Sequence, residues 1–255
     1  MSAVEYEVNG RIGTITLRRP EARNAVNADV ANGIEGAIDQ LEADPEVWVG
    51  IITGDGPVFS AGADLKEIAA GNATALETER GGFAGLARRE REKPLIAAVD
   101  GPALAGGCEI VLACDLVVAS RQAAFGLPEV KRSLVAAAGG LFRLPRKLPR
   151  NVALEMIMTG DPIDAERAFA FGLVNQLVEP GEVLHAATAL AERICANAPI
   201  AVRASRAIAL GGAGADDETA WKLTTDGFRK ILDTEDFREG PRAFIEKRPP
   251  RWQGR

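Results

Sequence analysis

Short apolar runs that end at turns alternate with helical stretches through the first two-thirds of the chain, and beyond Val178 the apolar runs no longer occur. Val47–Thr53 (VWVGIIT) ends at a glycine, and Leu95–Val99 (LIAAV) ends at Asp-Gly-Pro. Two further β-branched runs occupy Leu116–Ala119 and Val174–Val178. Short apolar runs bounded by turn residues are typical of buried strands, and helices between them cover the sheet. The pattern predicts a layered α/β core.

The N-terminal segment predicts a hairpin followed by a helix. Val4–Val8 and Arg11–Leu17 alternate around Asn9-Gly10, which is the strongest short hairpin signal. Asn27–Ala43 has apolar residues on one helical stripe. Three more helices are expected at Leu65–Ala70, Thr74–Arg91 and Cys108–Cys114.

Strand signals disappear beyond about Glu182. The remaining segments read as helices at Glu182–Ala196, Ile200–Leu210, Asp217–Asp233 and Asp236–Lys247. We therefore expect residues 1–195 to form the α/β core and residues 196–255 to form a helical C-terminal region.

Composition excludes several classes of protein. A chain of 255 residues with net charge −6 lacks the excess of Lys and Arg typical of nucleic-acid binding. Three cysteines, Cys108, Cys114 and Cys195, have no paired spacing, which fits free thiols in a reducing compartment. We see no secretory leader and no apolar run of ~20 residues, so we expect a cytoplasmic protein that does not bind membranes.

Several catalytic chemistries lack their residues. His185 is the only histidine, and no G-x-S-x-G accompanies it, which argues against a serine or cysteine triad. One histidine and scattered cysteines lack zinc-ligand spacing, so no metal is expected. Gly54-Asp55-Gly56 is followed by Phe59 where a dinucleotide fingerprint needs glycine, and no Walker motif exists. Carboxylates remain as candidates for proton transfer.

Two similar loops each follow a predicted buried strand. Phe59–Lys66 (FSAGADLK) opens a helix at Asp64, and Ala103–Glu109 (ALAGGCE) opens another at Cys108. Each can be an ordinary strand-to-helix loop, with Asp64 as an N-cap. Alternatively, the free N–H groups of the two loops can together bind an oxyanion.

Two glutamates stand at predicted helix starts. Glu109 lies in the first turn of an otherwise apolar helix, and Glu129 follows Pro128. Each can simply complement the helix dipole. Each can also serve as an acid or base, and the residues alone leave both interpretations open.

Together these segments closely resemble the crotonase superfamily, and specifically the enoyl-CoA hydratases. The paired A-G-A-D and A-G-G-C-E motifs are highly specific, and the resemblance runs in order along essentially the whole chain. The matching segments are Phe59–Ile68, Lys93–Ser120, FGLPEVK (Phe125–Lys131), Gly139-Gly140, Glu155–Gly160, Phe171–Val178 and EGPRAFIEKR (Glu239–Arg248).

The resemblance implies a spiral of ββα units with a C-terminal helical region used for trimerisation. It implies a trimer or a dimer of trimers that acts on acyl-CoA thioesters, with CoA as part of the substrate and no separate cofactor. The amides of Ala63 and Gly106 would bind the thioester oxyanion. Glu109 would take a proton from water as its oxygen attacks the β-carbon, and Glu129 would deliver a proton to the α-carbon.

The resemblance also implies contacts with the acyl-CoA. Arg23 is the expected partner of a CoA phosphate, although a solvated loop arginine is the alternative. Phe244 and Lys247 match positions near the nucleotide that a neighbouring subunit can supply. The full set of expected contacts is Arg23, Ala25, Ala61, Ala63, Asp64, Leu65, Leu104, Gly106, Gly107, Pro128, Ala137, Phe244 and Lys247.

One segment departs from the hydratase pattern. Where many hydratases carry Pro-Gly, this chain has Ala136 and Ala137, which adds side-chain volume where the family's water-binding glycine stands. The run Gly139–Pro149 and the terminus Glu246–Arg255 resemble the carnitinyl-CoA dehydratase branch. The leading expectation is hydration of trans-2-enoyl-CoA. The alternatives are dehydration of a polar acyl-CoA such as carnitinyl-CoA, or acyl-CoA binding without efficient catalysis.

Overall fold

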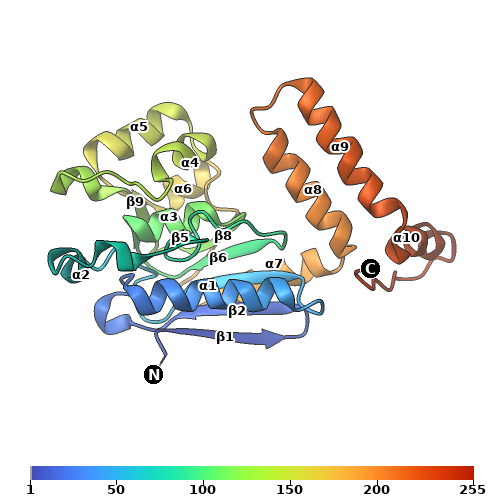
Figure 1. The fold of residues 1–255 in the computed structure, drawn as a ribbon, viewed down its shortest axis with the longest axis horizontal. Coiled ribbons are helices and arrows are strands. Elements are labelled where there is room, and N and C mark those ends of the chain that lie inside the picture. The colour runs from blue at the N-terminus through green and yellow to red at the C-terminus, as the bar shows by residue number, and fades with distance from the viewer. Residues whose placement is uncertain (1) are drawn as a thin grey trace.

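The computed structural model describes residues 2–255, and its core is a six-stranded sheet (Figure 1). The strand order is β1-β2-β3-β6-β8-β11. The first pair is an antiparallel hairpin, and the other neighbours are parallel, which confirms the predicted hairpin and buried strands. The strands are β1 (Val4–Asn9), β2 (Ile12–Leu17), β3 (Val49–Gly54), β6 (Leu95–Val99), β8 (Leu116–Ser120) and β11 (Gln176–Val178).

Both faces of this sheet are covered by helices, as its apolar runs require. Along β3, Val49 and Ile51 belong to one apolar cluster and Ile52 to another, because successive side chains point to opposite faces. α1 (Ala28–Ala43) packs on the face of Ile52, and α7 (Val183–Cys195) packs on the other. The doubly buried strands are therefore uniformly apolar.

A second, three-stranded sheet carries the helices that lie above the first. Its order is β10 (Ile163–Asp164), β9 (Ala124–Gly126) and β7 (Ala103–Leu104). The helices at this level are α2 (Leu65–Ala69), α3 (Gly106–Ala113), α4 (Gly140–Lys147), α5 (Arg150–Thr159) and α6 (Ala165–Ala170). Residues 2–255 also form three short 3₁₀ helices: η1 (Pro20–Ala22), η2 (Ala73–Leu76) and η3 (Pro128–Arg132).

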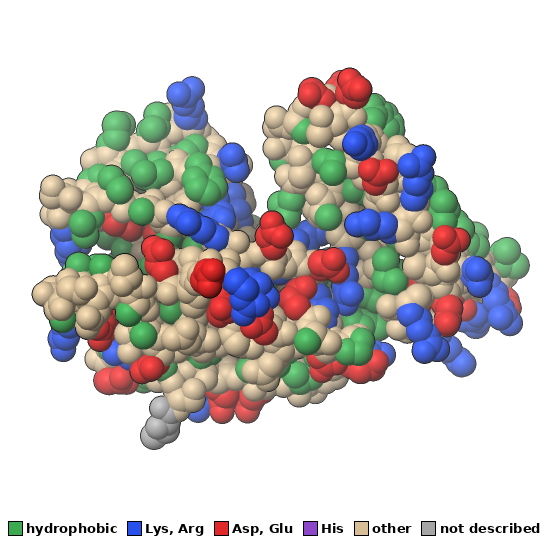
Figure 2. Space-filling model, in the orientation of Figure 1, with side chains coloured by type: hydrophobic (Ala, Val, Ile, Leu, Met, Phe, Trp, Pro, Cys, Tyr) green, Lys and Arg blue, Asp and Glu red, His purple; other side chains and the backbone are tan. Residues whose placement is uncertain are grey.

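The C-terminal helices extend away from the core. α8 (Pro199–Gly212), α9 (Asp217–Leu232) and α10 (Glu235–Ile245) form a second lobe in Figure 1, and Figure 2 shows a deep notch between the lobes. Arg206 of α8 ties this lobe to the core, because its Nε lies 2.9 Å from Asp115 Oδ1. The four predicted C-terminal helices are thus present. No helix within residues 2–255 is long and apolar enough to cross a bilayer.

The helix predicted over Thr74–Arg91 was wrong. The segment instead forms η2, a tiny hairpin of β4 (Glu77–Thr78) and β5 (Gly82–Phe83), and turns. Gly82, Ala84 and Gly85 all have positive φ, between 56° and 65°, which a right-handed helix cannot contain. A Cβ on Gly85 would lie 2.3 Å from the carbonyl oxygen of Ala31, so this segment passes directly over α1. Tertiary contact overrides local helix propensity here.

Candidate active site

The loop between β3 and α2 is held as a short parallel bridge to the segment after η1. The Val26 amide donates to Gly62 O (2.7 Å), and the Asp64 amide donates to Val26 O (2.9 Å). The amide of Ala63, between them, donates to no acceptor within residues 2–255. Asp64 caps α2 through Lys66 N (3.1 Å) and pairs with Arg19 (3.3 Å). The predicted capping role of Asp64 is therefore confirmed, and Ala63 offers a free N–H.

Asn24 fixes the backbone beneath this loop, and we did not single it out from the sequence. Its side chain is fully buried and donates to Asp55 O (2.9 Å) and Val58 O (2.8 Å) while accepting from Arg19 N (2.9 Å). Its φ of 51° lies in the left-handed region that asparagine tolerates better than most residues. Ser60 Oγ donates to the Asn24 carbonyl (2.8 Å). These bonds join the chain before α1 to the loop that carries Ala63.

The second loop approaches the first until their backbones touch. Leu104 N donates to Ser60 O (3.0 Å), and a Cβ on Gly62 would lie 2.6 Å from Gly106 N. A Cβ on Gly107 would lie 2.2 Å from Ser60 O, so glycine is required at this contact. Ala105, with φ 51° and ψ −129°, turns the chain sharply into α3. The Gly106 amide thereby begins a helix and has no acceptor among residues 2–255.

A cavity of about 680 Å³ opens in front of these two amides. It is lined by both predicted oxyanion donors and by both predicted catalytic glutamates. Apart from the amides and the glutamates, the predicted contacts that line it are Arg23, Ala25, Ala61, Asp64, Leu65, Leu104, Pro128 and Ala137. The structure therefore gathers around one cavity predicted contacts that are as far apart in the chain as Arg23 and Ala137.

Three predicted contacts lie elsewhere in this chain. Gly107 packs behind the cavity wall, against the Ser60 backbone. Phe244 is 85% exposed at the end of α10, and Lys247 follows it, on the lobe far from α2 and α3 in Figure 1. Within one chain these two residues do not reach the cavity.

Glu109 lies in the first turn of α3, only 3% exposed. Its Oε1 accepts a hydrogen bond from the Gly140 amide at 2.8 Å, at the start of α4. Burial raises the pKa of Glu109 to about 7, and the nearby Glu129 also raises it, whereas the Gly140 hydrogen bond and Arg143 lower it. A carboxyl that titrates near neutrality can both take and give a proton under working conditions.

Glu129 follows Pro128 in the first turn of η3. Burial raises its pKa as well, while Arg132 lowers it. Its Oε2 is buried without a hydrogen-bond partner among residues 2–255. A buried carboxylate oxygen without a partner is costly in a purely structural role, and it is a candidate to bind a water or a substrate group.

Two cations that we did not single out also line the cavity. Lys66 and Arg132 are exposed, and like Arg23 neither forms an ion pair within residues 2–255. Three unpaired cations around one opening suit an anionic ligand such as a phosphate. Lys66 lies within the A-G-A-D-L-K segment, so its place two residues after the Asp64 cap was the available signal.

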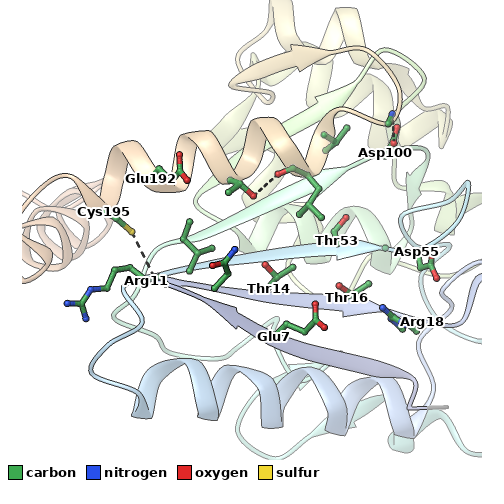
Figure 3. Close-up of a pocket in the computed structure, with 18 of the residues that line it drawn as sticks. Glu7, Arg11, Thr14, Thr16, Arg18, Thr53, Asp55, Asp100, Glu192 and Cys195 are labelled. Atoms are coloured by element: carbon green, nitrogen blue, oxygen red, sulfur yellow. Dashed lines mark hydrogen bonds between the residues drawn. The ribbon is translucent and has the colours of Figure 1, made fainter.

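A second hollow, of about 890 Å³, lies between the β1-β2-β3 strands and α7 (Figure 3). Thr14, Thr16 and Thr53 line its floor, while Arg18 and Asp55 stand near its edge (Figure 3). Neither free loop amide lines it, and neither do Glu109 and Glu129. This hollow is larger than the first cavity, but it is only the part of the sheet face that α7 leaves uncovered. The candidate oxyanion donors and catalytic glutamates line the smaller cavity.

Comparison with known proteins agrees with this geometry. Residues 7–255 match the family model described as enoyl-CoA hydratase/isomerase. A carnitinyl-CoA dehydratase from Salmonella typhi is 42% identical over 253 residues, which are 97% of each chain. The structure of an enoyl-CoA hydratase from Mycobacterium tuberculosis H37Rv is 48% identical with a TM-score of 0.96. A carnitinyl-CoA dehydratase from Mycobacterium avium 104 is also 48% identical with a TM-score of 0.80, and both structures cover all of each chain.

The predicted fold is thereby confirmed as that of the crotonases. The relatives are named as hydratases and dehydratases, which supports a lyase. The chain belongs to the enoyl-CoA hydratase/isomerase family.

Proposed function

We propose that this protein catalyses the reversible addition of water to a trans-2-enoyl-CoA thioester. The observation that carries the proposal is the placement of two glutamates with raised pKa values, the buried Glu109 and the half-buried Glu129, in one cavity with two free amides. The ionised Glu109 takes a proton from water while the water oxygen bonds to the β-carbon. Electrons move from the double bond to the thioester oxygen.

The resulting oxyanion lies between the N–H groups of Ala63 and Gly106. Glu129 then donates its proton to the α-carbon, and the thioester carbonyl re-forms. A buried and a half-buried carboxyl suit this exchange, because their desolvation and mutual repulsion keep one protonated while the other is ionised. The carboxyls and amides supply the chemistry, so the reaction uses no metal and no cofactor beyond the CoA of the substrate.

The acyl-CoA binds with its phosphates toward Arg23 and Lys66, which stand unpaired at the opening. Exposed apolar side chains on the C-terminal lobe, including Trp221, Phe244 and Ile245, support assembly as a trimer or a dimer of trimers. In such an assembly Phe244 and Lys247 come to the nucleotide of a neighbouring subunit. Light scattering on the purified protein measures the oligomeric state, and a monomeric mass would refute the proposed trimer or dimer of trimers.

Dehydration of a polar acyl-CoA is the second candidate. Its support is the replacement of the family's Pro-Gly by Ala136 and Ala137, together with relatives that are named carnitinyl-CoA dehydratases. The exposed cations Arg132 and Lys66 at the cavity would repel a cationic acyl group, so charge counts against a substrate of that kind.

The test is the loss of conjugated thioester absorbance with crotonyl-CoA and longer enoyl-CoAs. Carnitinyl-CoA is assayed in parallel by mass spectrometry. Turnover of enoyl-CoAs that disappears in Glu109→Gln supports the proposal. Turnover of carnitinyl-CoA alone would replace it with the second candidate, and binding of acyl-CoA without turnover of any substrate would refute both.

A further inference from the structure

Arg143 occupies an unusual place for a cation, on α4 directly behind the buried Glu109. Burial lowers the pKa of its guanidinium, yet no carboxylate within residues 2–255 lies at ion-pair distance from it. Its partners are two backbone carbonyls: Nη1 donates to Ala138 O (3.0 Å) and Nη2 donates to Ala87 O (2.6 Å). A partly buried charge without a counter-ion costs stability, so its retention needs another reason.

The guanidinium clamps the turn that precedes α4. Gly139 has φ 106°, and a Cβ there would lie 2.2 Å from Arg143 Nη1, so the guanidinium rests directly on this glycine. The next residue, Gly140, donates the amide hydrogen bond to Glu109 Oε1. Arg143 thus fixes the Ala138–Gly139 peptide unit, which directly precedes the Gly140 amide that donates to the Glu109 carboxylate.

The segment that leads into this turn contains the departure from the hydratase pattern. The Ala136 and Ala137 positions, where many hydratases carry Pro-Gly, run directly into Ala138. Without a proline the segment has more backbone freedom in the unfolded chain and fewer internal constraints. The bond from Arg143 to the Ala138 carbonyl, and its second bond to the separate Ala87 segment, supply a constraint from outside the loop.

We propose that Arg143 is a positioning residue for the hydration reaction, because it holds the Ala138–Gly140 turn that orients and polarises Glu109. This inference rests on the proposed function. The charged or titratable groups that face Glu109 are Glu129 from η3, the buried thiol of Cys108 on α3, and Arg143 from α4. Among these groups Arg143 alone is a cation, so it alone favours the ionised form of Glu109.

The sign of the effect follows directly. Removing the cation makes Glu109 harder to ionise, so its pKa rises. Because the water-activating form of Glu109 is the carboxylate, the acidic limb of kcat/KM moves to higher pH. Loss of the carbonyl bonds also frees the turn, and a displaced Gly140 amide lowers kcat roughly 10–100-fold. Arg143 itself does not line the cavity, whereas Ala138 of the turn does, so KM is expected to change less than kcat.

The test uses R143M and R143K, with R146M as the matched control. Arg146 lies one turn further along α4 and stacks on Phe142 at 5.2 Å, almost as Arg143 does at 5.1 Å. R146M removes the same charge and a similar contact without touching the turn. Two readouts are taken: kcat with its pH profile, and titration of the Glu109 carboxyl by ¹³C NMR, assigned with E109Q.

R143M is expected to lower kcat and raise the titration midpoint of Glu109, whereas R146M does neither. R143K keeps the charge but cannot reach both carbonyls, so it restores the midpoint more fully than kcat. The proposal is overturned if R143M, like R146M, changes neither kcat nor the titration midpoint of Glu109. It is also overturned if R143M does not fold while R143K folds and keeps the full wild-type kcat, because the two carbonyl bonds would then be unnecessary for the reaction. Absence of wild-type turnover would refute the proposed function instead, and the NMR titration would still test Arg143.

Discussion

Replacing Glu109 by glutamine removes a buried charge and keeps the shape and acceptor oxygen of the side chain. The Gly140 amide can still donate to the new carbonyl oxygen. A pKa raised from 4.5 to about 7 makes ionisation in the folded protein costlier by about 3 kcal/mol, since each pKa unit corresponds to about 1.36 kcal/mol. The variant avoids this cost and should lose ~10²–10⁴-fold in hydration rate.

The stability gain has a definite dependence on pH. The folded state binds the Glu109 proton more tightly than the unfolded state, so the stability it contributes is complete below about pH 4.5 and is lost as pH rises through about 7. E109Q should therefore match wild type at about pH 4 and exceed it by up to about 3 kcal/mol at about pH 8.5.

Guanidinium unfolding at both pH values and one protein concentration measures this difference. E109A is the control, because it also removes the charge but leaves the Gly140 amide without an acceptor. It should show the same pH trend at lower absolute stability. An equal difference at both pH values, or an E109Q variant less stable than wild type at the higher pH, would refute the burial argument.

Substitutions at four further positions test the site. Glu129→Gln should lower the hydration rate ~10²–10⁴-fold with little change in acyl-CoA affinity measured by calorimetry. Ala63→Pro removes one oxyanion donor and should lower kcat ~10²–10³-fold, whereas Ala63→Gly keeps the N–H and should stay near wild type; equal kcat values in the two would count against the amide. Asn24→Ala loses three part-buried hydrogen bonds to backbone groups and should cost about 2–4 kcal/mol in denaturant unfolding; a loss below about 1 kcal/mol would contradict the role of Asn24. Ala137→Gly removes a methyl group from the cavity wall and should raise kcat/KM for bulky acyl groups relative to crotonyl-CoA by roughly 10-fold, and an unchanged ratio would place the restriction elsewhere.

The sequence predicted the fold well where its segments have one dominant constraint. β3 and β6 are apolar because both of their faces are covered, and α1 and α7 show clear amphipathic stripes. It failed over Thr74–Arg91, where Gly82, Ala84 and Gly85 have positive φ and Gly85 packs closely against α1. We also did not predict α4–α6, of which α4 contains a proline within the helix.

The candidate site was predictable in its residues but not in its supporting contacts. Glu109 and Glu129 were ambiguous when read singly, since each stands at a helix start. The hydrogen bond from Gly140 to Glu109 spans 31 residues, and those of Asn24 to Asp55 and Val58 span 31 and 34. No local pattern encodes such contacts, and only the folded chain shows which carboxylate is buried and what holds it.

A double-mutant cycle tests the central claim that Glu109 and Glu129 act together as base and acid in one hydration reaction. Initial rates of crotonyl-CoA hydration are compared for wild type, E109Q, E129Q and the double variant. Residues that act as a unit are strongly non-additive. We predict that each single variant loses ~10²–10⁴-fold and that the double variant is scarcely slower than the worse single one. Additive losses, or a single variant that retains the wild-type rate, would contradict the account.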